Sequence, residues 1–376
     1  MTIHVWVPDY AATSGGIKVF SRCLVRGLRE LRPAASIVVF SKNDTSYPDS
    51  TQEPANEVKP FGWWSPRQRT VAFASTLFSR AARDRPDLII STHVNFAVAA
   101  RMLQRFLDIP FWVVGHGVDV WTVSNAGMRE ALRAADVLLA VSLYTRARMA
   151  TTLEISADRI NILPDTFDSE KFQIAPKPRF LLNRYGLRPD QPVIFTVGRL
   201  EAAEQYKGYD QVLRALPAIL RVFPAARYVL GGRGPDRARI ESLVRELDLG
   251  NAVILAGYIA DHELCSHYNL CDVFVMPSKG EGFGIVFLEA LACGKPVVAG
   301  NKDASVEAVL GGKLGVLVDP DDPRQIADAV IQILSRTHPN KVLQEPEMLR
   351  REVIEAYGYE RFVETLEKLT RGKLKS

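Results

Sequence analysis

Strand-like and helix-like segments alternate along the whole chain of 376 residues. Short runs of apolar and β-branched residues predict buried strands, and longer stretches with apolar residues every three or four positions predict amphipathic helices. Regular alternation of the two is typical of parallel sheets joined by right-handed crossovers. The sequence therefore predicts an α/β fold, with strands at Ile3 to Val7, Ser36 to Phe40, Asp87 to Ser91, Phe111 to Gly115, Val137 to Val141, Ile160 to Leu163, Val193 to Val197, Tyr228 to Gly231, Val253 to Leu255, Val273 to Met276, Val297 to Ala299 and Val316 to Val318.

One long stretch interrupts this alternation. The residues from Ser41 to Pro60 are polar and rich in proline, aspartate and serine, and they are expected to form a long loop.

The chain is long enough for two domains, since one domain ordinarily takes roughly 100 to 200 residues. Prolines after residue 171 interrupt the alternation, which then restarts. We predict a doubly wound, Rossmann-like domain at 1–170, a linker or hinge at 171–190, a second such domain at 191–356 and an amphipathic C-terminal helix at about 357–372. Two domains of this kind are expected to face each other across a cleft, with ligands outside the carboxyl ends of the strands.

Composition excludes several classes of protein. A content of 47% hydrophobic and 24% charged residues is typical of a globular enzyme. No run of about 18 apolar residues occurs, and Thr2 to Val7 predicts a strand rather than a signal segment, so we expect a cytoplasmic protein. The four cysteines form no CxxC pair, which favours a reducing compartment. A net charge of +4 is too small to indicate a nucleic-acid partner.

A basic and aromatic segment lies in the first half of the chain. It opens with Phe61-Gly-Trp-Trp64, and apolar residues at helical spacing follow at Val71, Phe73, Ala74, Leu77 and Phe78. Up to Pro110 its arginines are Arg67, Arg69, Arg80, Arg83, Arg85, Arg101 and Arg105. This composition predicts peripheral contact with an anionic membrane surface through residues 61–85. The alternative is an ordinary domain helix with an apolar core face and a charged outer face.

The segment from Pro277 to Gly300 carries two carboxylates around a glycine-rich turn. A strand is expected before the turn and a helix from Gly284 to Cys293 after it. Free N–H groups at the start of that helix favour an anion such as a diphosphate. Glu281 lies just outside the helix and Glu289 about one and a half turns inside it, so one ligand could span both carboxylates with its hydroxyls. The alternative is that Glu281 complements the helix dipole and Glu289 lies on a solvated face.

Two cations flank the loop after the expected strand at Val193 to Val197. Arg199 and Lys207 can both reach a phosphate there, and we expect them to converge with the helix start near Gly284 at one edge of the sheet. Each cation alone could equally be a solvated surface residue. The geometry of the loop is left open because it also carries Glu201, Glu204 and Tyr206.

Glycines and histidines follow three strands of the first half. Ser14-Gly15-Gly16 stands between the first strand and the first helix, where backbone N–H groups can meet a phosphate, although glycine there could simply permit a tight turn. His116 stands between two glycines directly after a strand, so its ring is expected to point into the cleft; a structural histidine is the alternative. His93 has the same topology with less context.

Three motifs are set aside. His262-Glu263 and His267 lie about 140° apart around a helix, unlike the zinc pattern HExxH. Asp319-Pro-Asp321 spells DxD, but Asp322-Pro323 behind it predicts a helix N-cap with proline at the first position. Gly231-Gly-Arg-Gly-Pro235 lacks the third glycine of a dinucleotide site. We expect neither a metal ion nor a nicotinamide or flavin cofactor.

These elements together resemble a known family. The glycine pair near the N-terminus, the Gly-Arg followed by Lys-Gly, and Glu-Gly-Phe-Gly-Ile-Val-Phe-Leu-Glu are similar to the retaining glycosyltransferases of family 4, group 1, which have the GT-B fold. The resemblance covers essentially the whole chain and is most specific between Glu281 and Glu289. It implies that the second domain binds a nucleoside diphosphate sugar and that the first binds the acceptor. It also implies that the C-terminal helix at about 357–372 packs back on the first domain.

The resemblance also implies roles for individual residues. Glu289 is expected to hydrogen-bond the ribose, while Glu281 binds hydroxyls of the donor sugar. Arg199 and Lys207 would neutralise the leaving diphosphate, and His116 would contact the transferred sugar. Gly257-Tyr258 is the expected turn near the base, and it does not separate uridine from guanosine or adenosine. The remaining donor-binding positions contribute backbone groups and are Gly15, Gly16, Gly282, Phe283, Gly284 and Ile285.

The predicted function is that of a retaining, metal-independent hexosyltransferase. It would move a sugar from a nucleoside diphosphate sugar to a glycan, lipid-linked or small-molecule acceptor in polysaccharide or glycoconjugate biosynthesis. Retention in the family is explained by attack on the same face, with the leaving phosphate accepting the proton. The alternatives are a GT-B-like sugar-nucleotide epimerase, which releases no transferred product, and a non-catalytic sugar-nucleotide sensor.

Overall fold

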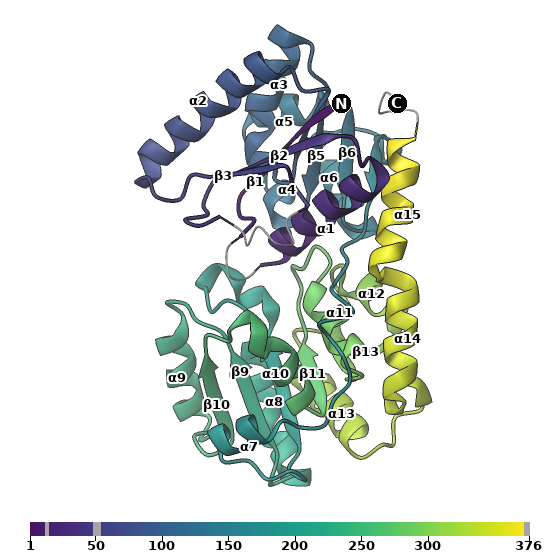
Figure 1. The fold of residues 1–376 in the computed structure, drawn as a ribbon. Coiled ribbons are helices and arrows are strands. Elements are labelled where there is room, and N and C mark those ends of the chain that lie inside the picture. The colour runs from purple at the N-terminus through teal and green to yellow at the C-terminus, as the bar shows by residue number, and fades with distance from the viewer. Residues whose placement is uncertain (12–14, 48–53, 372–376) are drawn as a thin grey trace. The chain divides into compact units, whose positions relative to one another are not determined.

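Two parallel sheets organise the chain, one in each of two units (Figure 1). The structure is a computed structural model that describes residues 1–11, 15–47 and 54–371. Unit 1 comprises Met1–Thr166 together with Tyr359–Ser376, and unit 2 comprises Phe167–Gly358. The predicted α/β class is therefore confirmed.

Unit 1 contains a seven-stranded sheet in the order β3-β2-β1-β4-β5-β6-β7. Val5 pairs in parallel with Val39 on one side and with Ile90 on the other, so the strand order reverses between β1 and β4. Such a reversal leaves a crevice outside the carboxyl ends of the two strands. The strands are β1 (Thr2–Val7), β2 (Ser36–Ser41), β3 (Glu57–Pro60), β4 (Leu88–Ser91), β5 (Phe111–Gly115), β6 (Val137–Ala140) and β7 (Ile160–Ile162).

Amphipathic helices cover this sheet. Helix α1 (Gly16–Leu31) buries Phe20, Leu24 and Leu28, which lie on one face at four-residue spacing. The C-terminal helix α15 (Tyr359–Thr370) packs against α1, as Figure 1 shows, with Phe362 in edge contact with Phe20 at 5.6 Å between ring centres. The other helices of unit 1 are α2 (Pro66–Asp84), η1 (Val94–Phe96), α3 (Ala97–Leu107), α4 (Val118–Trp121), α5 (Ala126–Arg133), α6 (Leu143–Leu153) and η2 (Ala157–Arg159).

Unit 2 contains a six-stranded parallel sheet in the order β10-β9-β8-β11-β12-β13. Phe274 pairs with Phe195, so the order reverses between β8 and β11. The strands are β8 (Val193–Val197), β9 (Arg227–Gly231), β10 (Val253–Gly257), β11 (Val273–Met276), β12 (Val297–Gly300) and β13 (Gly315–Val318).

The helices of unit 2 build its core against the sheet. Val212, Leu216 and Ile219 of α8 are fully buried in one cluster with Ile326 and Val330 of α13. In the described ranges of the chain, no helix combines the length and apolar composition needed to cross a membrane. The helices of unit 2 are α7 (Arg179–Tyr185), η3 (Ala202–Lys207), α8 (Tyr209–Val222), α9 (Arg237–Glu246), η4 (Asp261–Glu263), α10 (Leu264–Leu270), α11 (Ile285–Ala292), α12 (Ser305–Ala308), η5 (Leu310–Gly312), α13 (Pro323–Leu334), η6 (Lys341–Gln344) and α14 (Pro346–Tyr357).

The expected loop from Ser41 to Pro60 is partly wrong. Its last four residues form β3, an edge strand that pairs Val58 with Val39. An edge strand tolerates proline, and the polar residues on either side of Val58 obscured the strand pattern. Residues 48–53 of that stretch lie outside the described residues.

The proline-rich segment 171–190 packs within unit 2, and the division between units falls after Thr166. The segment contains α7, and hydrogen bonds and ion pairs bind it to the rest of unit 2. Lys177 Nζ donates to Asp272 over 2.7 Å, and the N–H of Ala175 donates to Asn269 Oδ1 over 2.9 Å. The prolines in the sequence show where the regular alternation of strands and helices is interrupted. They do not show whether the interrupted segment packs on the domain that follows it. Its role as a hinge stays a prediction.

Candidate functional site

The loops after β8 and β11 carry the predicted cations and carboxylates of unit 2. The two strands are neighbours at the reversal of the sheet, so their carboxyl ends open onto the same edge. The N–H of Lys279 donates to the carbonyl of Tyr206 over 2.9 Å, so the loops touch. A Cβ on Gly208 would lie 2.3 Å from the carbonyl oxygen of Pro277, and its φ of 79° is one that glycine adopts without strain. The two loops therefore converge, as the sequence predicts.

Lys207 and Glu281 form a shielded ion pair between these loops. Lys207 Nζ lies 2.5 Å from Glu281 Oε1, and the side chains are only 15% and 14% exposed. Burial alone lowers the pKa of Lys207, but the carboxylate of Glu281 outweighs it and raises the pKa above its usual range. Among the described residues, Glu281 Oε2 has no hydrogen-bond partner. The pair thus combines a fixed cation with a free carboxylate oxygen.

Arg199 extends further into solvent than Lys207. Its side chain is 78% exposed and forms an ion pair with Glu204, which also lies 3.8 Å from Lys207. The Tyr206 ring lies 5.4 Å from the ammonium of Lys207. The sequence left the geometry of this loop open because of Glu204 and Tyr206. In the structure Glu204 contacts both cations, and Tyr206 contacts Lys207.

A buried carboxylate that the sequence did not reveal supports Glu281. Asp303, which follows β12, accepts hydrogen bonds from the N–H of Glu281 over 2.7 Å and from Ser278 Oγ over 2.8 Å. Burial raises the pKa of Asp303, while these hydrogen bonds oppose the rise. In the sequence, Asp303 follows closely after the predicted strand Val297 to Ala299. That position at a strand end is the feature by which Asp303 could have been identified as a candidate site residue.

Helix α11 begins one residue later and ends one residue earlier than predicted. Gly284 is its N-cap with a φ of 97°. The N–H groups of Phe283, Gly284 and Ile285 have no hydrogen-bond partner in the part of the chain that the structure describes. Unpaired N–H groups and the positive end of the helix dipole together favour an anion.

Glu289 lies on the same helix and is almost fully buried. Tyr268 of α10 donates to Glu289 Oε2 over 2.7 Å, and Glu289 Oε1 has no hydrogen-bond partner within the described ranges. Burial raises the pKa of Glu289 to about 7, against the hydrogen bond from Tyr268 and the charge of Lys171. Tyr268 belongs to no motif, so its role could not be seen in the sequence. Glu281 and Glu289 therefore share one arrangement, with one oxygen held by a protein donor and the other left free.

The expected base-contacting turn lies at the end of β10. Tyr258 is partly exposed, and the guanidinium of Arg233 lies 4.7 Å from the centre of its ring. The carbonyl of Gly257 accepts a hydrogen bond from the N–H of Gly232 over 2.7 Å. A Cβ on Gly232 would lie 1.9 Å from the carbonyl of Gly198, so this glycine permits the turns after β8 and β9 to touch.

The predicted residues of unit 1 lie at the carboxyl ends of β1, β4 and β5. Gly15 is the N-cap of α1, and Gly16 is its first residue; both are exposed. Ser14 lies outside the described residues. His93 caps η1 by accepting a hydrogen bond from the N–H of Asn95 over 3.1 Å, which is a structural role.

The hydrogen bond of His116 determines which ring nitrogen is available. Its Nε2 lies 3.1 Å from the carbonyl of Thr92, and because a carbonyl only accepts, Nε2 carries the proton. Burial lowers the pKa of His116 to about 3, so the ring is neutral. Nδ1 is then an acceptor, and no described residue donates to it.

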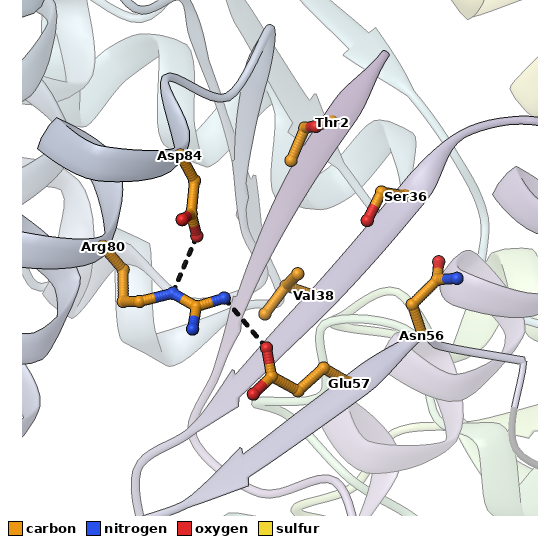
Figure 2. Close-up of a pocket in the computed structure, with 7 residues that line it drawn as sticks. All are labelled: Thr2, Ser36, Val38, Asn56, Glu57, Arg80 and Asp84. Atoms are coloured by element: carbon orange, nitrogen blue, oxygen red, sulfur yellow. Dashed lines mark hydrogen bonds and ion pairs between the residues drawn. The ribbon is translucent and has the colours of Figure 1, made fainter.

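A cavity of about 530 Å³ lies at the opposite edge of the unit 1 sheet, where β1, β2 and β3 begin (Figure 2). Arg80 occupies it between two carboxylates, 2.7 Å from Asp84 and 2.8 Å from Glu57 (Figure 2). Arg80 is thus neutralised and ties α2 to β3. The cavity is separate from the strand ends that carry Gly15 and His116. Its lining residues are Thr2, Ser36, Val38, Asn56, Glu57, Arg80 and Asp84.

The motifs set aside have structural explanations. Both ring nitrogens of His267 are engaged, by the Glu263 carbonyl at 2.8 Å and the Tyr185 hydroxyl at 2.9 Å. Asp322 caps α13 with Pro323 at its first position, as predicted. Lys302 pairs with both Asp319 and Asp321. No group of three or more metal-ligating side chains occurs among the described residues, and metal independence stays a prediction.

Comparison with known families covers both halves of the chain. Residues 14–171 match Glycosyltransferase Family 4, and residues 179–352 match Glycosyl transferases group 1. The chain is similar, with 37% identity over 232 residues, to the GDP-mannose-dependent alpha-(1-6)-phosphatidylinositol monomannoside mannosyltransferase of Mycolicibacterium smegmatis. It is 33% identical over 218 residues to the D-inositol 3-phosphate glycosyltransferase of Acidothermus cellulolyticus. These alignments span 58% and 55% of this chain, but only 59% and 48% of the relatives' own lengths.

Solved structures share the fold over nearly the full length. Sucrose-phosphate synthase from Thermosynechococcus elongatus superposes with a TM-score of 0.82 at 23% identity, covering 98% of both chains. Anabaena HepE in complex with UDP and glucose superposes with a TM-score of 0.79 at 20% identity, covering 98% of this chain and 99% of the other. The two family matches cover both halves of the chain, and the superpositions agree with its fold of two parallel sheets. The chain therefore belongs to the family 4, group 1 glycosyltransferases and has the GT-B fold.

Proposed function

We propose that this chain transfers a sugar from a nucleoside diphosphate sugar to an acceptor hydroxyl. One observation carries the proposal: Glu281 and Glu289 each have one oxygen held by a protein donor and one without a partner among the described residues, beside a shielded ammonium and unpaired N–H groups. Free carboxylate oxygens accept from hydroxyls of a sugar or ribose. The ammonium and the N–H groups attract a diphosphate. A sugar nucleotide combines these two kinds of group in one molecule.

In this proposal the residues of unit 2 bind the donor. Glu289 accepts from a ribose hydroxyl, and Glu281 accepts from a hydroxyl of the donor sugar. Lys207, Arg199 and the start of α11 stabilise the charge on the diphosphate as the sugar leaves, as preorganised charges do in other group transfers. The leaving phosphate takes the acceptor's proton on the same face, so the transfer retains the anomeric configuration without a metal ion.

The predicted residues of unit 1 have complementary roles in the proposal. Neutral His116 offers Nδ1 as an acceptor, which suits a hydroxyl of the transferred sugar. Gly15 and Gly16 offer exposed backbone at the start of α1, which suits a phosphate oxygen.

GDP-mannose is the first donor to test, because the M. smegmatis relative is named as GDP-mannose-dependent. UDP-glucose is the second, because Anabaena HepE, which shares the fold, has been crystallised in complex with it. A phosphatidylinositol mannoside is the first acceptor to test, because the M. smegmatis relative is named for such an acceptor, and it fits the lipid-linked class.

The test is a transfer assay with each donor, with and without acceptor, read by mass spectrometry and by proton NMR of the new anomeric centre. We expect an acceptor-dependent product with the configuration of the donor, together with release of the nucleoside diphosphate. Conversion of the donor without acceptor would indicate an epimerase. Tight donor binding without any release of nucleoside diphosphate across the panel would indicate a sensor. An inverted product would overturn the retaining mechanism.

We also propose that unit 1 contacts an anionic membrane through the tip of α2, defined as Trp63, Trp64, Arg67 and Val71. The three apolar side chains are 50 to 66% exposed, and a hollow of about 420 Å³ lies beside Trp64 and Val71. The surface is smaller than the segment 61–85, because Phe73 and Leu77 are buried in the core. Arg80 is neutralised, and Arg69 donates to the carbonyl of Trp64.

Flotation with phosphatidylglycerol vesicles and with neutral phosphatidylcholine vesicles tests this contact. We expect binding to the anionic vesicles, and we expect Trp63→Ser, Trp64→Ser and Val71→Ser in combination to abolish it. Val222→Ser, at an exposed position on α8 of unit 2, is the matched control. Equal binding of the triple variant, or no binding by the unchanged chain, would overturn the proposal.

A further inference from the structure

Two cysteines from different helices lie close together in unit 2. The sulfur of Cys265, in the first turn of α10, is 3.9 Å from the sulfur of Cys293, the residue that follows α11. Cys265 is half-buried, whereas Cys293 is fully buried. Nothing in the proposed transfer reaction uses either thiol.

The surroundings of Cys265 favour its thiolate. Asn269 Nδ2 lies 3.5 Å from its sulfur, and the ammonium of Lys171 contributes a nearby positive charge. The contact with Cys293 and these groups lower the pKa of Cys265 to about 6. A thiolate that solvent can reach is the form that reacts with oxidants. Cys271 differs, because burial raises the pKa of its thiol to about 12.

We propose that Cys265 and Cys293 are a site of reversible oxidation, at which a peroxide converts the two thiols into a disulfide between α10 and α11. The Cys265 thiolate attacks the peroxide oxygen, which breaks the O–O bond and leaves a sulfenic acid and an alcohol or water. The Cys293 thiol then attacks the sulfenic sulfur, and water leaves as the S–S bond forms. The peroxide accepts the two electrons that the thiols lose.

The position of the pair connects this oxidation to the rest of unit 2. Cys265 is three residues before Tyr268, and Cys293 is four residues after Glu289, whose carbonyl accepts the N–H of Cys293 over 3.1 Å. A disulfide requires the sulfurs to approach by about 2 Å, because the S–S bond is about 2.05 Å long. That approach moves α10 against α11, and the hydrogen bond from Tyr268 to Glu289 joins the same two helices. Oxidation therefore weakens donor binding, a consequence that rests on the proposed function.

The chemical claim is tested by oxidising the intact chain with hydrogen peroxide, alkylating the remaining thiols with N-ethylmaleimide and mapping the peptides by mass spectrometry. We expect a Cys265–Cys293 disulfide that dithiothreitol reverses, while Cys23 and Cys271 stay reduced. Cys23→Ser, in unit 1, is expected to form the same disulfide. Cys293→Ser and Cys293→Ala are expected to stop at a sulfenic acid on Cys265 that dimedone labels. Cys265 oxidised to a sulfinic acid beside an alkylated Cys293, or both thiols alkylated as in untreated protein, would overturn the claim.

The consequence for binding is tested separately, with GDP and UDP as probes. Oxidised protein is expected to bind the preferred nucleotide about five- to tenfold more weakly, because that is the effect of losing one hydrogen bond. The affinity of the Cys265→Ser variant is expected not to change on treatment with peroxide. Unchanged affinity after complete disulfide formation would overturn the coupling. If neither nucleotide binds the reduced protein, the proposed function and the coupling both fail, and the peptide map still decides the oxidation chemistry.

Discussion

The ammonium of Lys207 lies 2.5 Å from Glu281 Oε1, although the two residues are 74 positions apart in the chain. The contact forms because β8 and β11 are neighbours at the point where the order of the unit 2 sheet reverses. Doubly wound sheets bind their ligands at such a point. The ion pair of Lys207 and Glu281 therefore lies where a sheet of this architecture is expected to bind a ligand.

Removing the cation of this pair is expected to destabilise the fold as well as to weaken donor binding. Lys207→Met leaves the shielded carboxylate of Glu281 without its partner, which costs about 1 to 3 kcal/mol. In the double variant Lys207→Met, Glu281→Gln, no charge is left unpaired, so stability returns towards the original value while nucleotide affinity stays low. Urea denaturation and calorimetric titration measure the two effects. Recovery of affinity together with stability would show that Lys207 is only structural.

The approach of the two loops depends on a glycine that can be compared with a matched control. Gly208 and Gly186 both have positive φ, but a Cβ on Gly208 meets the Pro277 carbonyl at 2.3 Å, while a Cβ on Gly186 meets nothing within 4 Å. Gly186→Ala is expected to cost about 1 to 2 kcal/mol from backbone strain alone. Gly208→Ala is expected to cost more and to lower nucleotide affinity, because the loop that carries Lys207 must move. Equal thermal shifts for the two variants would contradict this explanation.

The buried carboxyl of Glu289 predicts a pH dependence of stability. Its pKa is raised by burial from 4.5 to about 7, so in that range the folded chain holds a proton that the unfolded chain has lost. The contribution of Glu289 to stability therefore falls as pH rises from 4.5 to about 7 and remains unfavourable above it. Glu289→Gln cannot ionise and is expected to be more stable than the unchanged chain at about pH 8, by on the order of 1 to 3 kcal/mol. The gain is expected to vanish near pH 4.5.

Thermal unfolding across this pH range measures the effect, with Glu241→Gln on the surface of α9 as the control. The same Glu289 variant is expected to bind nucleotide more weakly at every pH, so stability and binding change in opposite directions. A variant less stable than the unchanged chain at about pH 8 would contradict the assigned burial cost.

Tyr268 is expected to act on donor binding through Glu289. Tyr268→Phe removes the hydrogen bond that favours the carboxylate, so the pKa of Glu289 rises further. At neutral pH the affinity for nucleotide is expected to fall about five- to tenfold, and the deficit is expected to shrink as pH rises and Glu289 ionises. Calorimetric titration at several pH values measures this. A deficit that does not depend on pH would indicate that the hydroxyl acts only through packing.

Chelation tests the expectation that no metal takes part. Dialysis against EDTA is expected to leave transfer activity unchanged, because the cations Lys207 and Arg199 and the start of α11 replace a divalent ion. Loss of activity that magnesium or manganese restores would contradict this expectation.

The sequence was sufficient for most of the fold because buried parallel strands are continuous apolar runs, as in Val273 to Met276. It missed β3, since an edge strand with Val58 as its one apolar buried residue before Pro60 gives no such run. The catalytic candidates of unit 2 were found because they stand on strand-end loops. The loops that carry them converge because β8 and β11 are neighbouring strands in the sheet of unit 2.

The supporting residues were not predictable in the same way. Tyr268 and Asp303 act through contacts made across 21 and 22 positions of the chain, and neither has a local pattern that distinguishes it. The sequence also could not show that Glu204 would hold Arg199 and Lys207 together, because an acidic residue beside two cations is compatible with either a support or a solvated surface.

Calorimetric titration of the intact chain with GDP and UDP, for the unchanged protein and for Lys207→Met and Glu289→Ala, tests the proposed donor site most directly. We predict that one of the two nucleotides binds and that each substitution weakens its binding, by about 10- to 100-fold for the loss of a charged contact from Lys207. Arg221, at the far end of α8, provides the control substitution Arg221→Met, which is expected to leave affinity unchanged. Binding that neither Lys207→Met nor Glu289→Ala affects, or no binding of either nucleotide, would contradict the assignment of this site.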